Sequence, residues 1–409
     1  MTGRGGRARA GVVALAVLLV LAGVVALVKY ERRDKGTPYV PPRAGQASIL
    51  LTADQAGSGL DLNTIRADDG MAFAPDGSLY VLRTDLFRVS PDRKVSRVWR
   101  AGAYATGGLT VLPDGTVAVG VRGGVLRIDA HGKASTLAGS PDPAPGKKKG
   151  KGDDDGAGTG GTSGTGGTGS TGGDSGAKGA AGPAGSTDAT GSTLPAGSTA
   201  FVGVARPLGT RPDGALLVQD FSAVYAVEDG TATKVLDTPV ASAYLNTDTD
   251  TDAVRPTADA AGDVYFVAAA DHVAGLSHRI TRVTPSGESA PLPIPKRIPG
   301  LPGDPDRLTV QSLAGDGADG VYVDAVGGSG GSGGSGSTGG LDDYIVHLHD
   351  GKARVVGHSH TAAHVLDCTL PHAVSALELP CSLPAGMAYR DGRLALDGMV
   401  HYTLEVAVS

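Results

Sequence analysis

Short aliphatic runs alternate with polar turns along most of this chain of 409 residues. About six times, a turn that ends in Asp-Gly or Gly-Asp is followed by an aliphatic run, as at residues 75–81, 113–119 and 390–396. Period-two alternation in short runs bounded by Gly, Pro and Asp is the sequence signal of β-strands. A recurring unit of several short strands is typical of a β-propeller. The pattern therefore predicts an all-β fold.

The two ends of the chain complete each other. Each unit divides into four predicted strands, but the sixth, which begins near Gly386, has three before the chain ends. Residues 47–52, ahead of the first unit, have the pattern of the missing fourth strand. Pairing the two ends removes an exposed sheet edge and closes the ring. We therefore predict a six-bladed β-propeller over residues 46–409.

Two stretches interrupt the strand pattern. Residues 138–193 contain no Val, Ile, Leu, Met or aromatic residue, and residues 327–340 are rich in Gly and Ser. Such segments cannot bury enough apolar surface to offset the entropy of ordering them. We predict that both are disordered inserts in the propeller.

The N-terminal region predicts a membrane attachment. Residues 11–28 carry no polar side chain, and three arginines precede them. At about 1.5 Å of rise per residue, a helix of this length crosses most of a bilayer core. We predict a cytoplasmic tail at 1–10, a transmembrane signal anchor at 11–28 and a Pro-rich linker at 29–45. A cleaved signal peptide is the alternative, because Ala22 and Ala26 lie near the end of the run.

Long C-terminal domains are translocated largely regardless of flanking charge. We therefore expect a single-pass protein of the cell membrane with its propeller on the extracytoplasmic side. The abundance of Gly, Ala, Asp and Arg and the scarcity of Asn are typical of GC-rich coding, as in actinobacteria.

The exported part is acidic. The chain has a formal net charge of −6, although residues 1–35 carry seven Lys or Arg against two acidic residues. Binding to nucleic acid calls for a basic stripe, so we expect no nucleic-acid partner. Cys368 and Cys381 lie close together in this part, which suits one disulfide in an oxidising compartment. Two free, half-buried thiols are the alternative.

The repeated units resemble NHL repeats. The residues that match best are Asp114-Gly115, Leu126-Arg127-Ile128 and Thr136-Leu137-Ala138-Gly139-Ser140. The resemblance covers residues 46–409 and implies a propeller, commonly with a binding role. The chain departs from that family because its third strands lack the usual Asn-Arg pair, so the resemblance implies no particular ligand.

One face of the predicted ring carries the long connections. In a four-stranded blade, the loops after the second and fourth strands share one face, which we call the elaborated face. Both inserts and the segments 237–255, 293–305 and 357–384 fall there. The loops after the first and third strands are short and form the opposite, short-turn face. Since loops on a rigid scaffold carry function, we expect the binding surface on the elaborated face.

Two polar groups on this face are candidate metal ligands. Asp248, Asp250 and Asp252 alternate with threonines like the start of a calcium loop, but Ala253 and Asp259 stand where an EF-hand has Gly and Glu.

His358 and His360 alternate along a predicted strand and point to one side, so that they could bind zinc together with His364. Solvated polar loops are the alternative for both groups, and no other cofactor is expected.

The sequence favours a non-enzymatic propeller that binds an envelope protein, a glycan or a small molecule. The alternative is a hydrolase similar to gluconolactonase, with a divalent metal in its central channel. That resemblance requires a Glu at the start of the first blade and Asn ligands on inner strands. The chain has Asp68-Asp69 at the first position, and its two asparagines, Asn63 and Asn246, lie in predicted loops.

We predict that the anchor stays attached, because its apolar run is longer than the hydrophobic region of most signal peptides. Mass spectrometry of the native protein should find a chain that contains residues 1–28 in the membrane fraction. A soluble form that begins near Gly23 or Leu27 would contradict this prediction.

Overall fold

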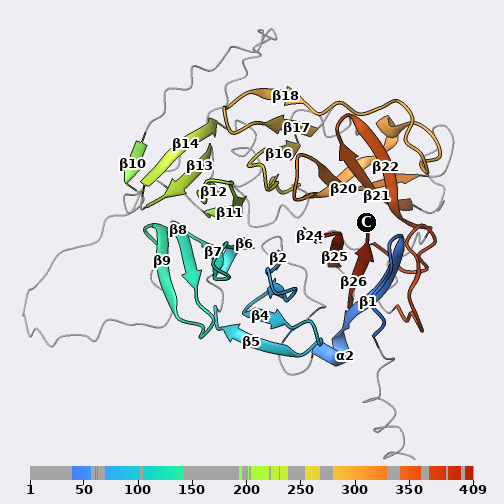
Figure 1. Ribbon diagram of the computed structural model, residues 1–409, viewed down its shortest axis with the longest axis horizontal. Helices are drawn as coiled ribbons and strands as arrows, with labels where there is room; N and C mark the ends of the chain where they lie inside the picture. Colours follow the sequence, from blue (N-terminus) through green and yellow to red (C-terminus); the bar gives the residue numbers. More distant parts are fainter. Residues whose placement is uncertain are drawn as a thin grey trace, which may run out of the picture.

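A computed structural model describes residues 39–56, 60, 62, 70–101, 105–141, 193–195, 201, 204–220, 223–229, 231–237, 254–267, 280–328, 341–360, 368–383, 386–397 and 401–408. These residues form six antiparallel sheets, arranged as blades around a common centre (Figure 1). The predicted all-β, six-bladed propeller is confirmed. The predicted helix over residues 11–28 lies outside the described residues. Within the part of the chain that is described, no helix has the length and apolar character to cross a membrane.

Blades 1 and 2 each contain four strands, given from the centre outward. Blade 1 consists of β2 (Gly70–Phe73), β3 (Leu79–Leu82), β4 (Leu86–Val89) and β5 (Val95–Trp99). Blade 2 consists of β6 (Ala105–Val111), β7 (Val117–Val121), β8 (Gly124–Ile128) and β9 (Ala134–Gly139).

Blades 3 and 4 follow the same order. Blade 3 consists of β11 (Arg206–Thr210), β12 (Leu216–Gln219), β13 (Ala223–Glu228) and β14 (Thr231–Asp237), with β10 (Thr193–Pro195) added outside β14. Blade 4 consists of β15 (Thr257–Ala258), β16 (Val264–Val267), β17 (Ile280–Val283) and β18 (Ser289–Pro291).

Blades 5 and 6 complete the ring. Blade 5 consists of β19 (Thr309–Gly315), β20 (Val321–Gly328), β21 (Leu341–His349) and β22 (Lys352–Ser359). Blade 6 consists of β24 (Gly386–Arg390), β25 (Arg393–Asp397), β26 (Tyr402–Ala407) and β1 (Gln46–Thr52), with β23 (Val374–Ser375) outside β1. Two short helices, α2 (Ala53–Ala56) and η3 (Pro305–Arg307), lie between strands.

The Asp-Gly signature makes the tight turn between the first two strands of a blade. In blade 1, the amide of Ser78 donates to Oδ1 of Asp76 at 2.9 Å, and the amide of Gly77 donates to the carbonyl of Ala74 at 3.0 Å. Gly77 has a φ of 81°, which a residue with a side chain rarely adopts. The equivalent Gly115 has the same φ. Each of these turns joins the first two strands of its blade on the short-turn face.

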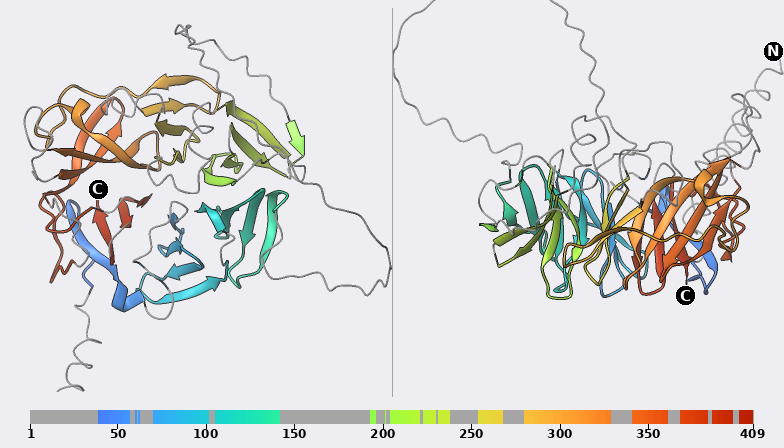
Figure 2. Two further views of the ribbon diagram at one scale, coloured as in Figure 1. Left: turned by 180° about the vertical axis from the view of Figure 1, so that it is seen from behind. Right: turned by 90° about the horizontal axis from the view of Figure 1, so that it is seen from above.

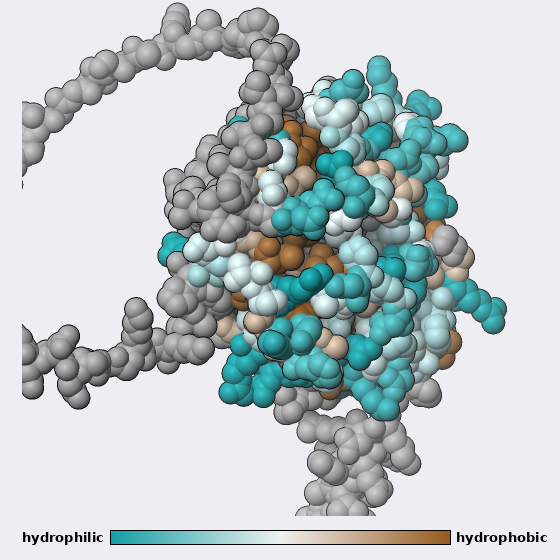
Figure 3. Space-filling view, turned by 60° about the vertical axis from the view of Figure 1, so that its left-hand side comes forward, coloured by the Kyte–Doolittle hydropathy of each residue, from teal (hydrophilic) through white to brown (hydrophobic). Residues whose placement is uncertain are grey.

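Most of the core lies between neighbouring blades, because both faces of each sheet are covered. All four residues of β3 are buried, for example. Leu79 and Val81 pack toward blade 6, and Tyr80 and Leu82 pack toward blade 2. On the side of the molecule seen in Figure 3, hydrophilic residues cover most of the coloured surface, and hydrophobic residues show mainly in the recesses between them.

The N-terminal strand closes the ring. β1 pairs with β26 in antiparallel fashion, from Ala47 opposite Val406 to Thr52 opposite Tyr402. Strict alternation would bury either Ile49 and Leu51 or Leu50. The register shifts between Ile49 and Leu51 instead, and both Leu50 and Leu51 are buried against blade 1.

The chain ahead of β1 also contacts the ring. The hydroxyl of Tyr39 donates to Oε2 of Glu405 at 2.6 Å, and the ring of Tyr39 lies under the guanidinium of Arg93. The linker predicted over residues 29–45 therefore ends in a docked segment. The chain end after β26 lies on the short-turn face (Figure 2).

The outer edge of β1 is covered by β23, a strand that the sequence did not predict. Ala47 pairs with Val374, and the amide of Ala376 donates to the carbonyl of Gly45 at 2.9 Å. A disulfide joins Cys368 to Cys381, on either side of β23, with their Cα atoms 5.5 Å apart. The bond closes the loop that carries this covering strand.

The boundaries of both inserts differ from the prediction. β9 continues to Gly139 and buries Ala138, so the first insert begins beyond these residues. At its other end, Thr193 starts β10, which pairs with β14. Gly327 and Gly328 belong to β20, opposite Asp342 and Leu341. The remaining insert residues lie outside the described part.

Removal of β1 should open the ring. A chain that begins at Asp54 loses the buried Ala47, Leu50 and Leu51 and exposes the edge of β26. We expect a loss of several kcal/mol, since each large buried aliphatic side chain contributes about 1.5–3 kcal/mol, and aggregation through the open edge. Denaturant unfolding and size-exclusion chromatography, compared with a chain that begins at Gln46, measure both. Equal stability and a monomeric state of the two chains would contradict the closure.

Candidate functional site

Aspartate and histidine side chains meet at one end of blade 5. Asp342 is the second residue of β21, His358 is the next-to-last residue of β22, and His360 follows that strand. The start of β21 lies beside the end of β22, because the two strands are antiparallel and Tyr344 pairs with His358. This end belongs to the elaborated face.

The three side chains converge on a small polar centre, the Asp342 cluster (Asp342, His358 and His360). Nδ1 of His360 lies 3.3 Å from Oδ1 of Asp342, and Nε2 of His358 lies 3.9 Å from the same oxygen. The two imidazole rings meet edge to face with their centroids 4.0 Å apart. Asp342 is buried, whereas the side chain of His360 is 72% exposed. The cluster is therefore anchored in the blade and open to solvent on one side.

Tyr344 supports two members of the cluster. Its ring stacks on that of His358 with centroids 4.5 Å apart, and its hydroxyl donates to Oδ2 of Asp342 at 3.4 Å. The backbone of His358 is held by Ala376 and Leu379, at 2.8 and 3.0 Å. These contacts fix the imidazole of His358 and leave Oδ1 of Asp342 facing it.

The hydrogen bonds of His358 determine which ring nitrogen carries the proton. A bond with the backbone of Leu377 acts on this imidazole, while Nε2 is buried with no hydrogen-bond partner among the described residues. The bond to Leu377 therefore engages Nδ1, which donates to the carbonyl, and Nε2 is left as an acceptor. Burial and then the neighbouring His360 lower the pKa of His358, which favours this neutral ring. Two acceptors, Nε2 and Oδ1 of Asp342, thus face each other at 3.9 Å.

Two imidazoles and one carboxylate suit zinc. Zinc–ligand bonds of about 2.0–2.2 Å in a tetrahedron place neighbouring ligand atoms roughly 3.3 Å apart, close to the 3.3 and 3.9 Å found here. Imidazole nitrogen does not suit calcium or magnesium, which prefer oxygen ligands. A ring nitrogen bound to a backbone carbonyl, as in His358, is the usual way in which a metal-binding histidine is oriented.

The structure brings together two of the three histidines that the sequence singled out. His358 and His360 lie side by side, and His364 lies outside the described residues, as do Asp248, Asp250 and Asp252. Sequence reasoning missed Asp342. The available signal was its place at the end of the Gly/Ser insert, directly before the aliphatic run of β21.

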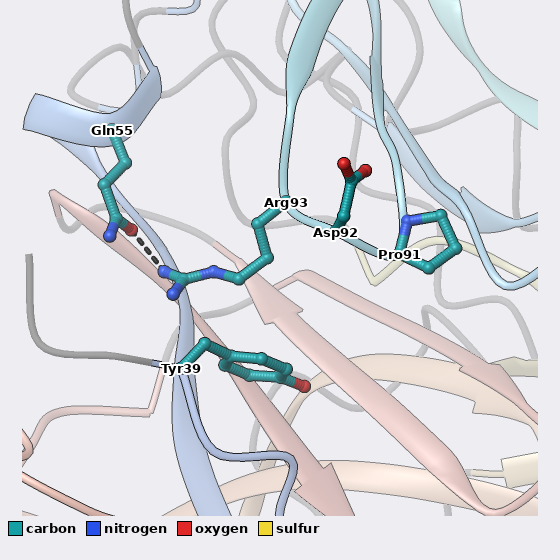
Figure 4. A pocket seen from close by; sticks show the side chains of 5 residues that line it. All are labelled: Tyr39, Gln55, Pro91, Asp92 and Arg93. Carbon is teal, nitrogen blue, oxygen red and sulfur yellow. Dashed lines mark hydrogen bonds between the residues drawn. The ribbon is translucent and has the colours of Figure 1, made fainter.

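A second polar recess lies where the N-terminal segment meets blade 1 (Figure 4). A cavity of about 510 Å³ is lined by Tyr39, Gln55, Pro91, Asp92 and Arg93. The guanidinium of Arg93 lies 4.8 Å from the ring centroid of Tyr39 and donates to the carbonyl of Leu50 at 2.7 Å and to Gln55. Arg93 thereby ties blade 1 to the closing strand β1. The residues that line this recess therefore have a structural role.

A groove of about 1070 Å³ is formed by residues 294–306, the connection between blades 4 and 5 on the elaborated face. Ile294, Ile298 and Leu301 contribute apolar walls. Lys296 and Arg297 are exposed at this groove. Asp304 and Asp306 line it too, so the elaborated face offers an apolar groove with charges of both signs in addition to the Asp342 cluster.

A buried carboxyl group lies deeper in blade 5. Asp324 of β20 is opposite Ser312 and Ile345, and its Oδ1 has no hydrogen-bond partner in the described part of the chain. Burial, reinforced by the negative charge of Asp343, raises the pKa of Asp324 well above its usual range. Burial therefore favours the protonated, neutral form of this carboxyl group.

The candidate ligands lie away from the central channel. In the described ranges, every group of three His, Cys, Asp or Glu side chains that could hold a metal involves residues of blade 5. The Asp342 cluster belongs to β21 and to the end of β22, the two outer strands of that blade.

Comparison with known proteins finds the fold but no family. No protein-family model matches the chain, so the resemblance to NHL repeats stays a prediction, and no curated protein matches it. A structural genomics protein of unknown function from Bacteroides thetaiotaomicron is similar with a TM-score of 0.50 and 13% identity, over 88% of this chain and 75% of that one. At this identity the likeness shows the fold alone.

Two further solved structures have lower scores. A gluconolactonase from Xanthomonas campestris has a TM-score of 0.42 at 14% identity, over 90% of this chain and 97% of that one. Regucalcin from Agrobacterium tumefaciens, a calcium-binding protein, has a TM-score of 0.43 at 13% identity, over 89% and 94% of the two chains.

The raised pKa of Asp324 predicts how stability depends on pH. In the unfolded chain this carboxyl group ionises near its ordinary pKa of 3.8, whereas burial in the folded protein raises the pKa well above that value. Between these values the folded state keeps a proton that the unfolded state has lost. The contribution of Asp324 to wild-type stability therefore falls as pH rises through this range, by at most about 1.4 kcal/mol per pH unit for one proton.

Asp324→Asn has the same shape without the charge. We expect the stability of this variant relative to the wild type to increase between about pH 4.5 and pH 8. Thermal unfolding at both pH values measures the difference. A difference that is the same at both would contradict the assignment of the proton.

Proposed function

We propose that this protein is a non-enzymatic binding propeller that holds a divalent transition-metal ion, in the first place zinc, in the Asp342 cluster. The observation that carries the proposal is that Nε2 of His358, buried and without a hydrogen-bond partner among the described residues, faces Oδ1 of Asp342 at 3.9 Å. A lone pair and a carboxylate that face each other repel, and a cation between them replaces this repulsion with two bonds. The third ligand, Nδ1 of His360, is 3.3 Å from the same oxygen.

The position of the cluster suits recognition of a partner. His360 is exposed, so an ion held there is accessible from solvent. Three protein ligands leave one position of a tetrahedral zinc ion open. A carboxylate or imidazole of an envelope protein, or an oxygen of a glycan or small molecule, can fill that position. Display of the elaborated face away from a membrane, through an anchor at residues 11–28, would present the site to such partners.

A metal-dependent hydrolase is the second candidate, because three protein ligands and one open position are also the arrangement of catalytic zinc sites. The ion there lowers the pKa of a bound water molecule and polarises a carbonyl group. The gluconolactonase-like form of this hypothesis places the metal in the central channel, and the Asp342 cluster lies on outer strands instead. Lactone hydrolysis that depends on added zinc and is lost in His358→Ala would favour this candidate.

We expect His358→Ala to remove one equivalent of bound zinc, because it deletes the buried nitrogen ligand. Isothermal titration calorimetry with zinc on the metal-free protein measures the stoichiometry and the affinity. His372→Ala is the matched control, since His372 is exposed on the surface and belongs to none of the candidate metal groups.

Loss of one of three ligands should weaken binding by more than the roughly 10–100-fold that outer-shell changes cause. The proposal is wrong if His358→Ala and His372→Ala bind the same number of zinc ions with the same affinity.

A further inference from the structure

A basic residue in the third strand pairs with an acidic turn in several blades. Arg88 of β4 lies opposite Tyr80, and its guanidinium is 2.6 Å from Asp76. Arg127 of β8 lies opposite Ala118, and its guanidinium is 2.7 Å from Asp114.

In blade 4, Arg282 lies opposite Tyr265 and pairs with Asp263. Each of these pairs ties the third strand to the turn between the first two strands on the short-turn face.

Blade 5 has histidine at this position. His347 lies opposite Tyr322, and its Nε2 is 2.9 Å from Oδ2 of Asp316 in the turn. Two residues further along the strand, Nδ1 of His349 is 3.0 Å from the same oxygen and 3.1 Å from Oδ1 of Asp319. A guanidinium, which is always charged, is thus replaced by two imidazoles between two carboxylates. We call these four residues the Asp316 cluster.

The surroundings hold each member in place. Oδ1 of Asp316 accepts hydrogen bonds from the amides of Ala318 and Gly320, at 2.8 and 3.0 Å, which leaves Oδ2 to face the imidazoles. The ring of His347 stacks on Tyr322 with centroids 4.4 Å apart.

Nε2 of His349 lies 3.7 Å from Asp350. A carboxylate beside the second ring nitrogen is the usual support of a metal-binding histidine.

Residue 320 leaves space beside the ligand atoms. The equivalent turn positions hold Ser78, Thr116 and Asp263, whose side chains bind the arginine of their blade. Gly320 stands there in blade 5. A Cβ atom on it would collide with Oδ2 of Asp316, lie 2.6 Å from the carbonyl oxygen of Leu348 and lie 2.9 Å from Nδ1 of His349. The glycine therefore allows the Asp316 carboxylate and the His349 imidazole to lie close together beside this backbone.

We propose that the Asp316 cluster is a second transition-metal site, on the short-turn face, with Asp316, His347 and His349 as ligands and Asp319 beside His349. Two imidazole nitrogens and a carboxylate oxygen suit zinc, cobalt or nickel, and not calcium or magnesium.

Oδ2 of Asp316 lies 2.9 Å from Nε2 of His347 and 3.0 Å from Nδ1 of His349, and Nδ1 of His349 lies 3.1 Å from Oδ1 of Asp319. A tetrahedral ion with bonds of about 2.0–2.2 Å needs roughly 3.3 Å between neighbouring ligand atoms. The site therefore has to open by a few tenths of an ångström.

The charges favour a dication. Asp316, Asp319 and Asp350 surround His349. Arg354, which lies opposite His347 on β22, donates to the carbonyl of Val408 at 3.1 Å. Its guanidinium is therefore held against the C-terminal strand.

The test uses the full chain in the His358→Ala background, which lacks the Asp342 cluster, and cobalt as the probe. Tetrahedral cobalt absorbs in the visible range, and a titration counts the bound ions. We expect one equivalent in His358→Ala and none in the double variant His358→Ala/His347→Arg. Arginine at residue 347 restores the ion pair of blades 1 and 2, so the double variant should keep the melting temperature of the metal-free background.

His358→Ala/His349→Ala checks the same site through a half-exposed residue and should weaken cobalt binding by more than about 100-fold. It also keeps the test decisive if arginine at residue 347 disturbs folding. The inference is overturned if His358→Ala binds no cobalt, or if the variants at residues 347 and 349 bind it as their background does. Failure of the Asp342 cluster is a separate result: His347→Arg alone would then bind none, while the wild type binds one.

Discussion

Closure of the ring is the constraint on which the rest of the structure depends. Each blade covers the face of the next, so the sixth interface forms only when the first and last blades meet. The chain meets this condition by placing β1, its first strand, against β26, its last, where Leu50 and Leu51 fill the space toward blade 1. Arg93 reinforces the same joint from blade 1 through the carbonyl of Leu50. The covering strand β23 then protects the edge that β1 would expose.

Against this constant framework, blade 5 has changed its polar residues at both ends. Blades 1, 2 and 4 tie strand to turn with arginine and aspartate. In blade 5 imidazoles replace the guanidinium on the short-turn face, and a second set of imidazoles meets Asp342 on the elaborated face. Because the backbone pairing of the blade is regular, apart from shifts between Val310 and Ser312 and between Ile345 and Val346, these substitutions change chemistry without changing the fold. A repeat protein can specialise one unit in this way while the others maintain stability.

The sequence was sufficient for the fold because strand alternation, Asp-Gly turns and the missing last strand are local signals that agree with one another. It was insufficient where contacts depend on register. His358 and His360 are two residues apart at the end of one strand, so their proximity could be predicted. Asp342 comes from the neighbouring strand, and the insert between β20 and β21 removes the turn from which that register could be read. The two-residue β23 was missed because so short a segment has no period. The docking of Tyr39 was missed because Pro-rich segments are typically spacers, and the sequence gives no sign that Glu405, 366 residues away, is its partner.

The joint between β1 and β26 also has a mechanical consequence. The chain makes a turn ahead of β1, where the amide of Gln46 donates to the carbonyl of Arg43 at 2.8 Å, and the hydrogen bonds from β1 to β26 run across the strand. A pull on the segment ahead of Tyr39 therefore acts on this turn before it acts on the strand pairing. The contact of Tyr39 with Glu405 and Arg93 takes up the first part of such a load before it reaches the strand. The strand that completes the propeller is thus also the first strand that a load on the N-terminal side of the chain would reach.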